Sequence, residues 1–123
     1  MAYLVVFLGA GLGGALRHGT NQAARLLGLG FPFGTATVNI VGSLIMGLLA
    51  GYFALKGGAG QHWRLFFTTG ILGGFTTFSA FSLDTVLLFE RGQLGLASLY
   101  VLVSVGVSIA ALFAGLVIMR ALT

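Results

Sequence analysis

The sequence contains no cysteine, a single proline and only two acidic residues. Without cysteine, neither a disulfide nor a thiolate metal site can form. Asp84 and Glu90 are the only acidic side chains, so paired-carboxylate catalysis and carboxylate-ligated metal sites lack their essential groups. The six Lys and Arg residues are scattered along the chain, so the net charge of +4 does not indicate nucleic-acid binding. These absences argue against an enzyme and against a nucleic-acid partner.

Charge of either sign is rare, since only 7% of the 123 residues are charged. An ordinary soluble domain carries about 25%. Hydrophobic residues make up 58% of the chain, the mean hydropathy is +1.07, and there are 21 glycines. A soluble domain is therefore excluded, and the composition predicts a lipid-embedded protein with closely packed helices. The length predicts one domain, residues 1–123.

Four apolar stretches are long enough to cross a bilayer core, which needs about 20 helical residues. The first has a polar C-terminal half, and the links between the stretches are too short to hold another domain. We expect helices at about residues 3–27, 34–55, 63–89 and 94–122, joined by links at 28–33, 56–62 and 90–93.

Glycines recur at four-residue spacing, which allows helix backbones to approach closely in lipid. The pairs are Gly9/Gly13, Gly47/Gly51 and Gly70/Gly74. Residues 9–14 also fit the pattern G-x-G-x-x-G of dinucleotide-binding sites. We reject that interpretation because no acidic residue follows at the required distance and no strand–helix–strand unit is predicted.

The basic residues predict no preferred orientation in the membrane. With four spans, one side has Lys56, Arg64 and Arg120, while the other has Arg25 and Arg91, plus Arg17 if it reaches the interface. Orientation follows the excess of Lys and Arg on the cytoplasmic side, and here there is almost none. We therefore expect insertion in both orientations, which would permit an antiparallel homodimer.

The third stretch is unusual between residues 70 and 82. Adjacent Gly73 and Gly74, followed by Thr76, Thr77 and Ser79, weaken a helix in the middle of the span. A break there would free backbone carbonyls that could bind a monovalent cation. The alternative is a kinked helix whose hydroxyl groups bond back to the preceding turn, and the sequence alone supports both equally.

Other polar groups fall inside the predicted spans. Asn39 lies in the second stretch, where an amide offers N–H donors, although it could equally join two helices by a hydrogen bond. Tyr100, Ser104 and Ser108 follow one another at four-residue spacing, which places their hydroxyls on one helix face. Such a stripe suits a moving anion, but it also suits helix–helix hydrogen bonding.

Phe78 and Phe81 flank Ser79 in the suspected break. The edge of a phenyl ring is positive and can solvate an anion without a full countercharge. Arg17 follows a long apolar run and needs a partner or a wet vestibule, with Asp84 as one candidate.

Three motifs together resemble the small bacterial fluoride channels of the Fluc or CrcB family, over essentially the whole chain. They lie at residues 11–17, 31–43 and 70–82, and the most specific is Gly73-Gly74-Phe75-Thr76-Thr77-Phe78-Ser79 combined with Asn39. The resemblance implies an all-helical membrane protein with the third of its four helices broken, assembled as an antiparallel dual-topology homodimer in the cell inner membrane. It further implies passive, fluoride-selective export that lowers fluoride toxicity.

The resemblance also implies roles for particular residues. A structural sodium ion would be held at the dimer interface by the backbone carbonyls of Gly73 and Thr76, and Arg17 would lie in a vestibule. The predicted fluoride pore comprises Thr35, Asn39, Thr77, Phe78, Ser79, Phe81, Tyr100, Ser104 and Ser108. The sequence departs from the family pattern at His18, Ala80 and Asp84, where tyrosine, threonine and glutamate are usual.

Two alternatives belong to other classes. A small multidrug-type cation/proton antiporter would need an acidic residue within its first helix, and residues 3–27 contain none. A non-transporting membrane subunit would not need polar residues concentrated at one break.

Overall fold

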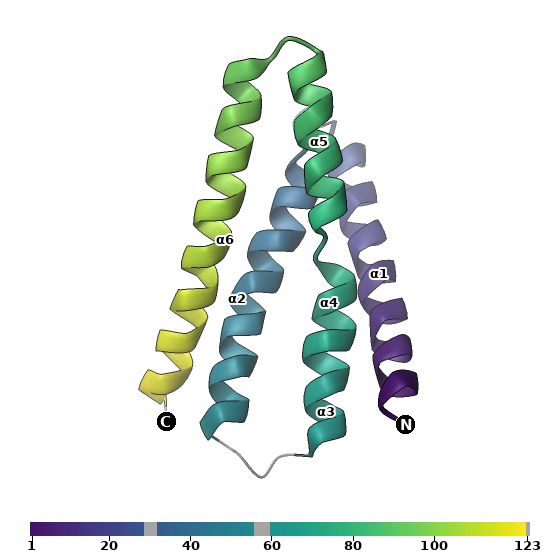
Figure 1. Cartoon of the computed structure of the whole chain (residues 1–123), viewed down its shortest axis with the longest axis vertical. Helices are drawn as coiled ribbons and strands as arrows, with labels where there is room; N and C mark the ends of the chain where they lie inside the picture. The colour runs from purple at the N-terminus through teal and green to yellow at the C-terminus, as the bar shows by residue number, and fades with distance from the viewer. Residues whose placement is uncertain (29–31, 56–59, 123) are drawn as a thin grey trace.

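The computed structural model describes residues 1–28, 32–55 and 60–122, and all the regular secondary structure within these ranges is helical, without a strand. In chain order the elements are α1 (Ala2–Leu26), α2 (Phe33–Leu55), α3 (Gln61–Leu65), the π-helix η1 (Phe66–Leu72), α4 (Gly73–Phe75), α5 (Phe78–Glu90) and α6 (Leu94–Leu122) (Figure 1). This confirms the predicted all-helical membrane protein with a broken third helix. Parts of the predicted links at 28–33 and 56–62, namely residues 29–31 and 56–59, lie outside the described residues.

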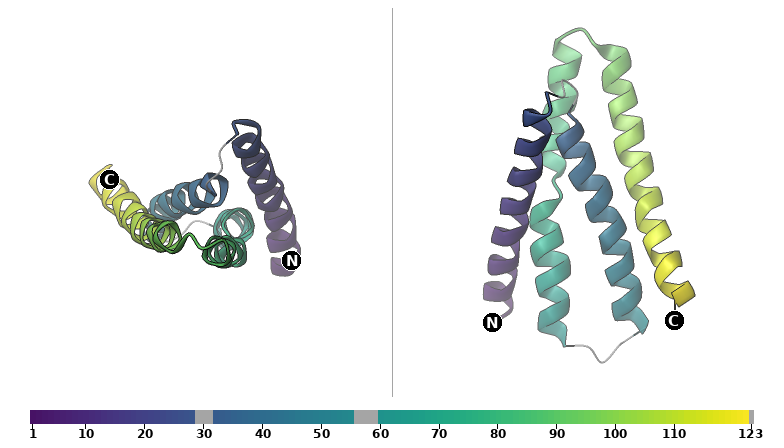
Figure 2. Two further views of the ribbon diagram at one scale, coloured as in Figure 1. Left: turned by 90° about the horizontal axis from the view of Figure 1, so that it is seen from above. Right: turned by 180° about the vertical axis from the view of Figure 1, so that it is seen from behind.

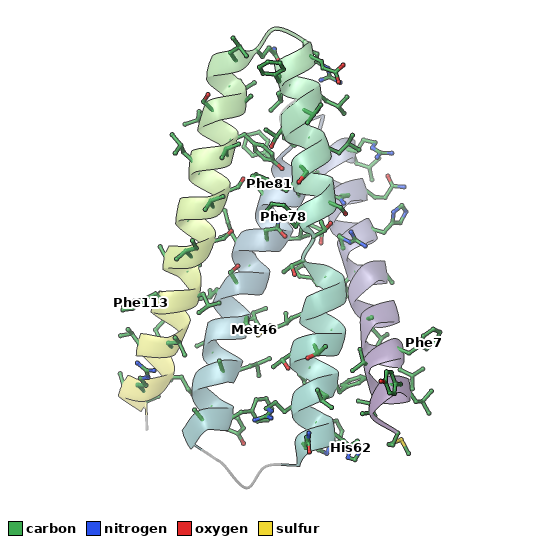
Figure 3. The ribbon with its side chains drawn as sticks, viewed as in Figure 1. Phe7, Met46, His62, Phe78, Phe81 and Phe113 are labelled. Atoms are coloured by element: carbon green, nitrogen blue, oxygen red, sulfur yellow. The ribbon has the colours of Figure 1, made fainter. Side chains whose placement is uncertain are left out.

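Three of the long helical segments are apolar enough to cross a membrane: Phe33–Ala54, Gln61–Glu90 and Leu94–Leu122. The segment α1 is not one of these three. It has 25 residues, but its second half carries polar side chains such as Arg17, Asn21 and Arg25. Large apolar side chains point away from the bundle, with Phe7 74% exposed and Phe113 67% exposed (Figure 3). These outward groups suit lipid, so the chain is a multi-pass membrane protein.

The helices stand side by side, with α1 and α6 at opposite edges and both chain termini at one end (Figures 1 and 2). The segment α6 packs along α2, while α1 packs along η1 and α4. Both α2 and α6 run from the opposite end toward the end that carries the termini. The two halves of the third span have different main neighbours, since η1 and α4 pack along α1, whereas α5 contacts α6.

Glycines allow these helices to touch backbone to backbone. A Cβ at Gly9 would lie 2.7 Å from the Phe66 carbonyl oxygen, and one at Gly13 would overlap the Ile71 carbonyl. On the other side of the bundle, a Cβ at Gly47 would overlap the Leu112 carbonyl of α6. The predicted close approach at four-residue glycine spacing is confirmed.

The third span is interrupted at Thr76 and Thr77, which are both extended, with ψ of 156° and 124°. The hydroxyl and amide groups of Thr76 both donate to the Leu72 carbonyl at 3.0 Å and satisfy the end of α4. The hydroxyl of Thr77 accepts a bond from the Ala80 amide at 3.2 Å and caps α5. A true break and hydroxyl groups bonded back to the preceding turn therefore occur together, although the sequence presented them as alternatives.

Candidate functional site

A pocket of about 300 Å³ lies beside the break, between α2, α5 and α6. Met46, Phe78 and Phe81, which line it, are labelled in Figure 3. The complete lining comprises Asn39, Gly42, Ser43, Met46, Thr76, Thr77, Phe78, Phe81, Ser104, Val105, Ser108, Ile109 and Leu112.

Asn39 holds the break open by bonding to the backbone of Thr77. Its amide nitrogen donates to the Thr77 carbonyl at 3.0 Å, and its amide oxygen accepts from the Thr77 N–H at 2.8 Å. In a continuous helix that N–H would donate to the carbonyl of Gly73, four residues earlier. Asn39 thus replaces the lost helical bond of the Thr77 N–H, and one of its own two N–H donors is not bonded within the described part of the chain.

Phe78 and Phe81 lie next to each other, with ring centroids 5.6 Å apart, but their environments differ. Phe81 is only 8% exposed and packs against the Tyr100 ring at 5.3 Å. Phe78 is 76% exposed, so the isolated subunit leaves it uncovered. Phe81 is part of the core, whereas the ring of Phe78 lies on the outer surface of the subunit.

Ser104 and Ser108 offer hydroxyl groups that have no hydrogen-bond partner among the described residues, although both oxygen atoms are buried. Other hydroxyls, such as those of Ser82 and Thr85, donate to the carbonyl four residues earlier in their own helix. A buried polar group without a partner costs free energy unless something else satisfies it. These two serines are therefore available to a ligand in the pocket.

Tyr100 and Thr35 do not line the pocket but lie in the core beyond its end, where their side chains meet. The Tyr100 hydroxyl donates to Asp84 Oδ2 at 3.1 Å. The structure thus gives Asp84 a partner other than Arg17, and no ion pair joins these two among the described residues. The Arg17 guanidinium instead lies near its own helix, 4.0 Å from where a Cβ at Gly14 would be.

The remaining predicted residues lie around the break. Ser79 is exposed, and its hydroxyl is 3.2 Å from that of Thr77. Gly73 is exposed on α4, while Thr76 lines the pocket. The structure therefore brings together seven of the predicted site residues and leaves Thr35, Gly73, Ser79, Tyr100 and Arg17 outside the lining. The seven are Asn39, Thr76, Thr77, Phe78, Phe81, Ser104 and Ser108.

Three lining residues on α2 were not predicted: Gly42, Ser43 and Met46. A Cβ at Gly42 would overlap the Thr76 side chain, so only glycine lets the break approach α2. Ser43 follows Asn39 by four residues, the same spacing as the serines of α6, and that spacing is the signal that could have identified it.

The chemistry of the pocket is neutral. Its lining contains amide, hydroxyl, phenyl and aliphatic groups and no acid or base. Among the described residues, no three His, Cys, Asp or Glu side chains lie close enough to hold a metal ion. An uncharged, mainly apolar pocket that holds a few amide and hydroxyl groups beside a broken membrane helix is typical of channels and transporters, in which irregular backbone lines a cavity. The fold and the pocket place the protein in that class.

The chain belongs to the CrcB family, because the model of that family, described as "CrcB-like protein, Camphor Resistance (CrcB)", matches residues 4–116. A relative from Rhodopseudomonas palustris (strain BisB5) is 63% identical over the full length of both chains. Another, from Methylobacterium nodulans, is 64% identical over 95% of this chain and 94% of its own. Both relatives are called "Fluoride-specific ion channel FluC".

Proposed function

We propose that this protein is a fluoride-selective channel that exports fluoride passively across the cell inner membrane and so reduces its toxicity. The observation that carries the proposal is the neutral pocket at the break, where Asn39, Ser104 and Ser108 offer uncharged donors. The names of the relatives at 63% and 64% identity support fluoride as the ion.

Fluoride is small and strongly hydrated, so a narrow path must replace the water that it loses. The free N–H of Asn39 and the serine hydroxyls supply hydrogen bonds, while the edges of Phe78 and Phe81 supply weak positive charge. A fixed cation in the path would bind the ion too tightly to release it. With no acid or base in the pocket lining and no acid in α1, transport proceeds without a coupled proton.

The site is completed by a second copy of the chain in an antiparallel homodimer. Phe78 is 76% exposed in one subunit, although it lines the pocket, so a partner is needed to close the path around it. The balanced basic residues support opposite orientations of the two copies. Arg64 and Arg120 lie toward the end that carries the termini, while Arg25 and Arg91 lie toward the other. Lys56 lies outside the described residues.

A sodium ion is the proposed structural cofactor, held by the backbone carbonyls of Gly73 and Thr76 in both subunits. The residues fit such an ion, since the Thr77 N–H that would bond the Gly73 carbonyl in a helix donates to Asn39 instead. Gly73 is exposed, so a second subunit could approach the chain at this point. Neutral carbonyl oxygens suit a monovalent cation, which would join the two breaks and add positive charge near the anion path.

The proposal is tested by ion flux from liposomes that contain the purified protein. We expect rapid fluoride release, measured with a fluoride electrode, and chloride release no faster than from protein-free liposomes. Comparable release of the two halides would contradict selectivity. Fluoride release only when a proton gradient is imposed would instead indicate coupled transport.

A further inference from the structure

The pocket has a second polar edge on α2, opposite the serines of α6. The two helices run in the same direction, and their contacts recur every four residues on both. The side chains of Thr35 and Tyr100 meet near one end. Farther along, Gly47 meets the Leu112 carbonyl.

Between those two contacts, the shared register pairs Asn39 with Ser104 and Ser43 with Ser108. All four residues line the pocket, which is consistent with this pairing. Because residues four apart share one helix face, Ser43 lies one turn beyond Asn39 on the same side of α2. The pocket therefore has polar groups from both helices at two successive levels.

The hydroxyl of Ser43 makes no hydrogen bond within the described part of the chain. Thr20, Thr68, Ser82 and Thr85 each donate to the carbonyl four residues earlier. No such bond joins Ser43 to another described residue, and Ser104 and Ser108 are likewise unbonded. The serines of this pocket thus differ from the hydroxyls that serve only their own helix.

The polar pairs Asn39/Ser104 and Ser43/Ser108 are the last polar groups along this part of the pocket. Beyond them the helices touch through their backbones, and a Cβ at Gly115 of α6 would lie only 2.7 Å from the Leu48 amide nitrogen. The lining at this end is apolar, with Met46, Ile109 and Leu112. An anion that reached this end would lose water on its apolar side, so every available donor would matter.

We propose that Ser43 is a further fluoride-binding residue, which forms with Ser108 a two-hydroxyl site at the apolar end of the pocket, one turn beyond Asn39 and Ser104. The proposal rests on the proposed fluoride channel function and adds a binding position one turn beyond Asn39. Each hydroxyl donates a hydrogen bond to the ion, and no proton is transferred. Hydrogen bonds to a charged group are stronger than those between neutral groups, so the loss of one donor should be measurable.

Fluoride release from liposomes, measured against fluoride concentration, tests this site. We expect Ser43→Ala to lower the initial rate at sub-saturating fluoride by about tenfold, and Ser43→Thr to retain most of the rate because it keeps the hydroxyl. Ser98→Ala, at an exposed position of α6 outside the pocket, should match the wild type. The Ser43→Ala/Ser108→Ala double variant should lose less than the product of the two single losses, because both hydroxyls bind one ion.

A Ser43→Ala rate within about twofold of the wild type, beside a strong loss in Ser104→Ala, would overturn the role of Ser43. Alanine is a better helix former than serine, so α2 should stay intact. If Ser43→Ala does not fold, Ser43→Cys decides, because a thiol has similar size but is a weak donor; a wild-type rate in that variant overturns the proposal. Absence of fluoride release from the wild type would instead contradict the channel function itself.

Discussion

At the scale of single residues, Asn39 both bonds to the backbone of Thr77 and offers an uncharged donor to the pocket. One substitution tests both roles without changing the size of the side chain. Asn39→Asp keeps the shape but cannot donate to the Thr77 carbonyl, and it adds a negative charge to the anion pocket. We expect fluoride release to fall by more than about tenfold and the free energy of unfolding to fall by about 1–3 kcal/mol. Liposome flux and thermal unfolding in detergent measure the two effects. Normal flux in this variant would show that the ion does not pass Asn39.

The two phenylalanines should respond differently to the same change, since one is buried and the other is not. Phe81→Ile removes a ring that is 8% exposed and packs on Tyr100, so we expect lower stability, by about 1–3 kcal/mol, as well as lower flux. Phe78→Ile alters a ring that is 76% exposed in the subunit. We expect this variant to keep the wild-type melting temperature in detergent but to lose fluoride flux. A stability loss confined to Phe78→Ile would contradict this division.

At the scale of helices, α1 offers a matched pair of glycines that tests the backbone contact with the third span. A Cβ at Gly13 would overlap the Ile71 carbonyl and lie 2.7 Å from the Phe75 amide nitrogen, whereas one at Gly11 meets nothing within 4 Å. We expect Gly13→Ala to lower the melting temperature by several degrees and to displace η1 and α4, with a loss of flux. Gly11→Ala should leave both unchanged. Equal stability of the two variants would show that α1 is not held at this contact.

The helices and their close contacts were predictable from the sequence because apolar length and glycine spacing are local signals. The break was predicted within residues 70–82, but its position at Thr76 and Thr77 depends on bonds from Asn39, which is distant in the chain. The π-helix of residues 66–72 was not predicted, because no local pattern distinguishes it from an α-helix. The bond between Tyr100 and Asp84 likewise depends on how α5 and α6 pack, which the spacing of residues within one helix does not fix.

At the scale of the whole molecule, the small number of charged residues affects how the subunit is oriented in the membrane. Arg64 and Arg120 lie toward one end of the bundle, and Arg25 and Arg91 lie toward the other. The arginines are therefore balanced, so neither end is favoured for the cytoplasm. A subunit that inserts in both orientations gives antiparallel partners without a second gene product. An antiparallel dimer would contain two neutral pockets, one from each subunit, with opposite orientations in the membrane. Both pockets would lie within its apolar interior.

The absence of cysteine makes this orientation directly measurable. Gln61→Cys and Gln93→Cys place a single exposed thiol at opposite ends of the bundle. In intact cells, a membrane-impermeant maleimide should label about half of each variant, because the balanced charges give no preferred orientation. The other half should react only after permeabilisation, which serves as the control for thiol accessibility. Complete labelling of one variant from outside and none of the other would show a single orientation, and the antiparallel dimer would then be wrong.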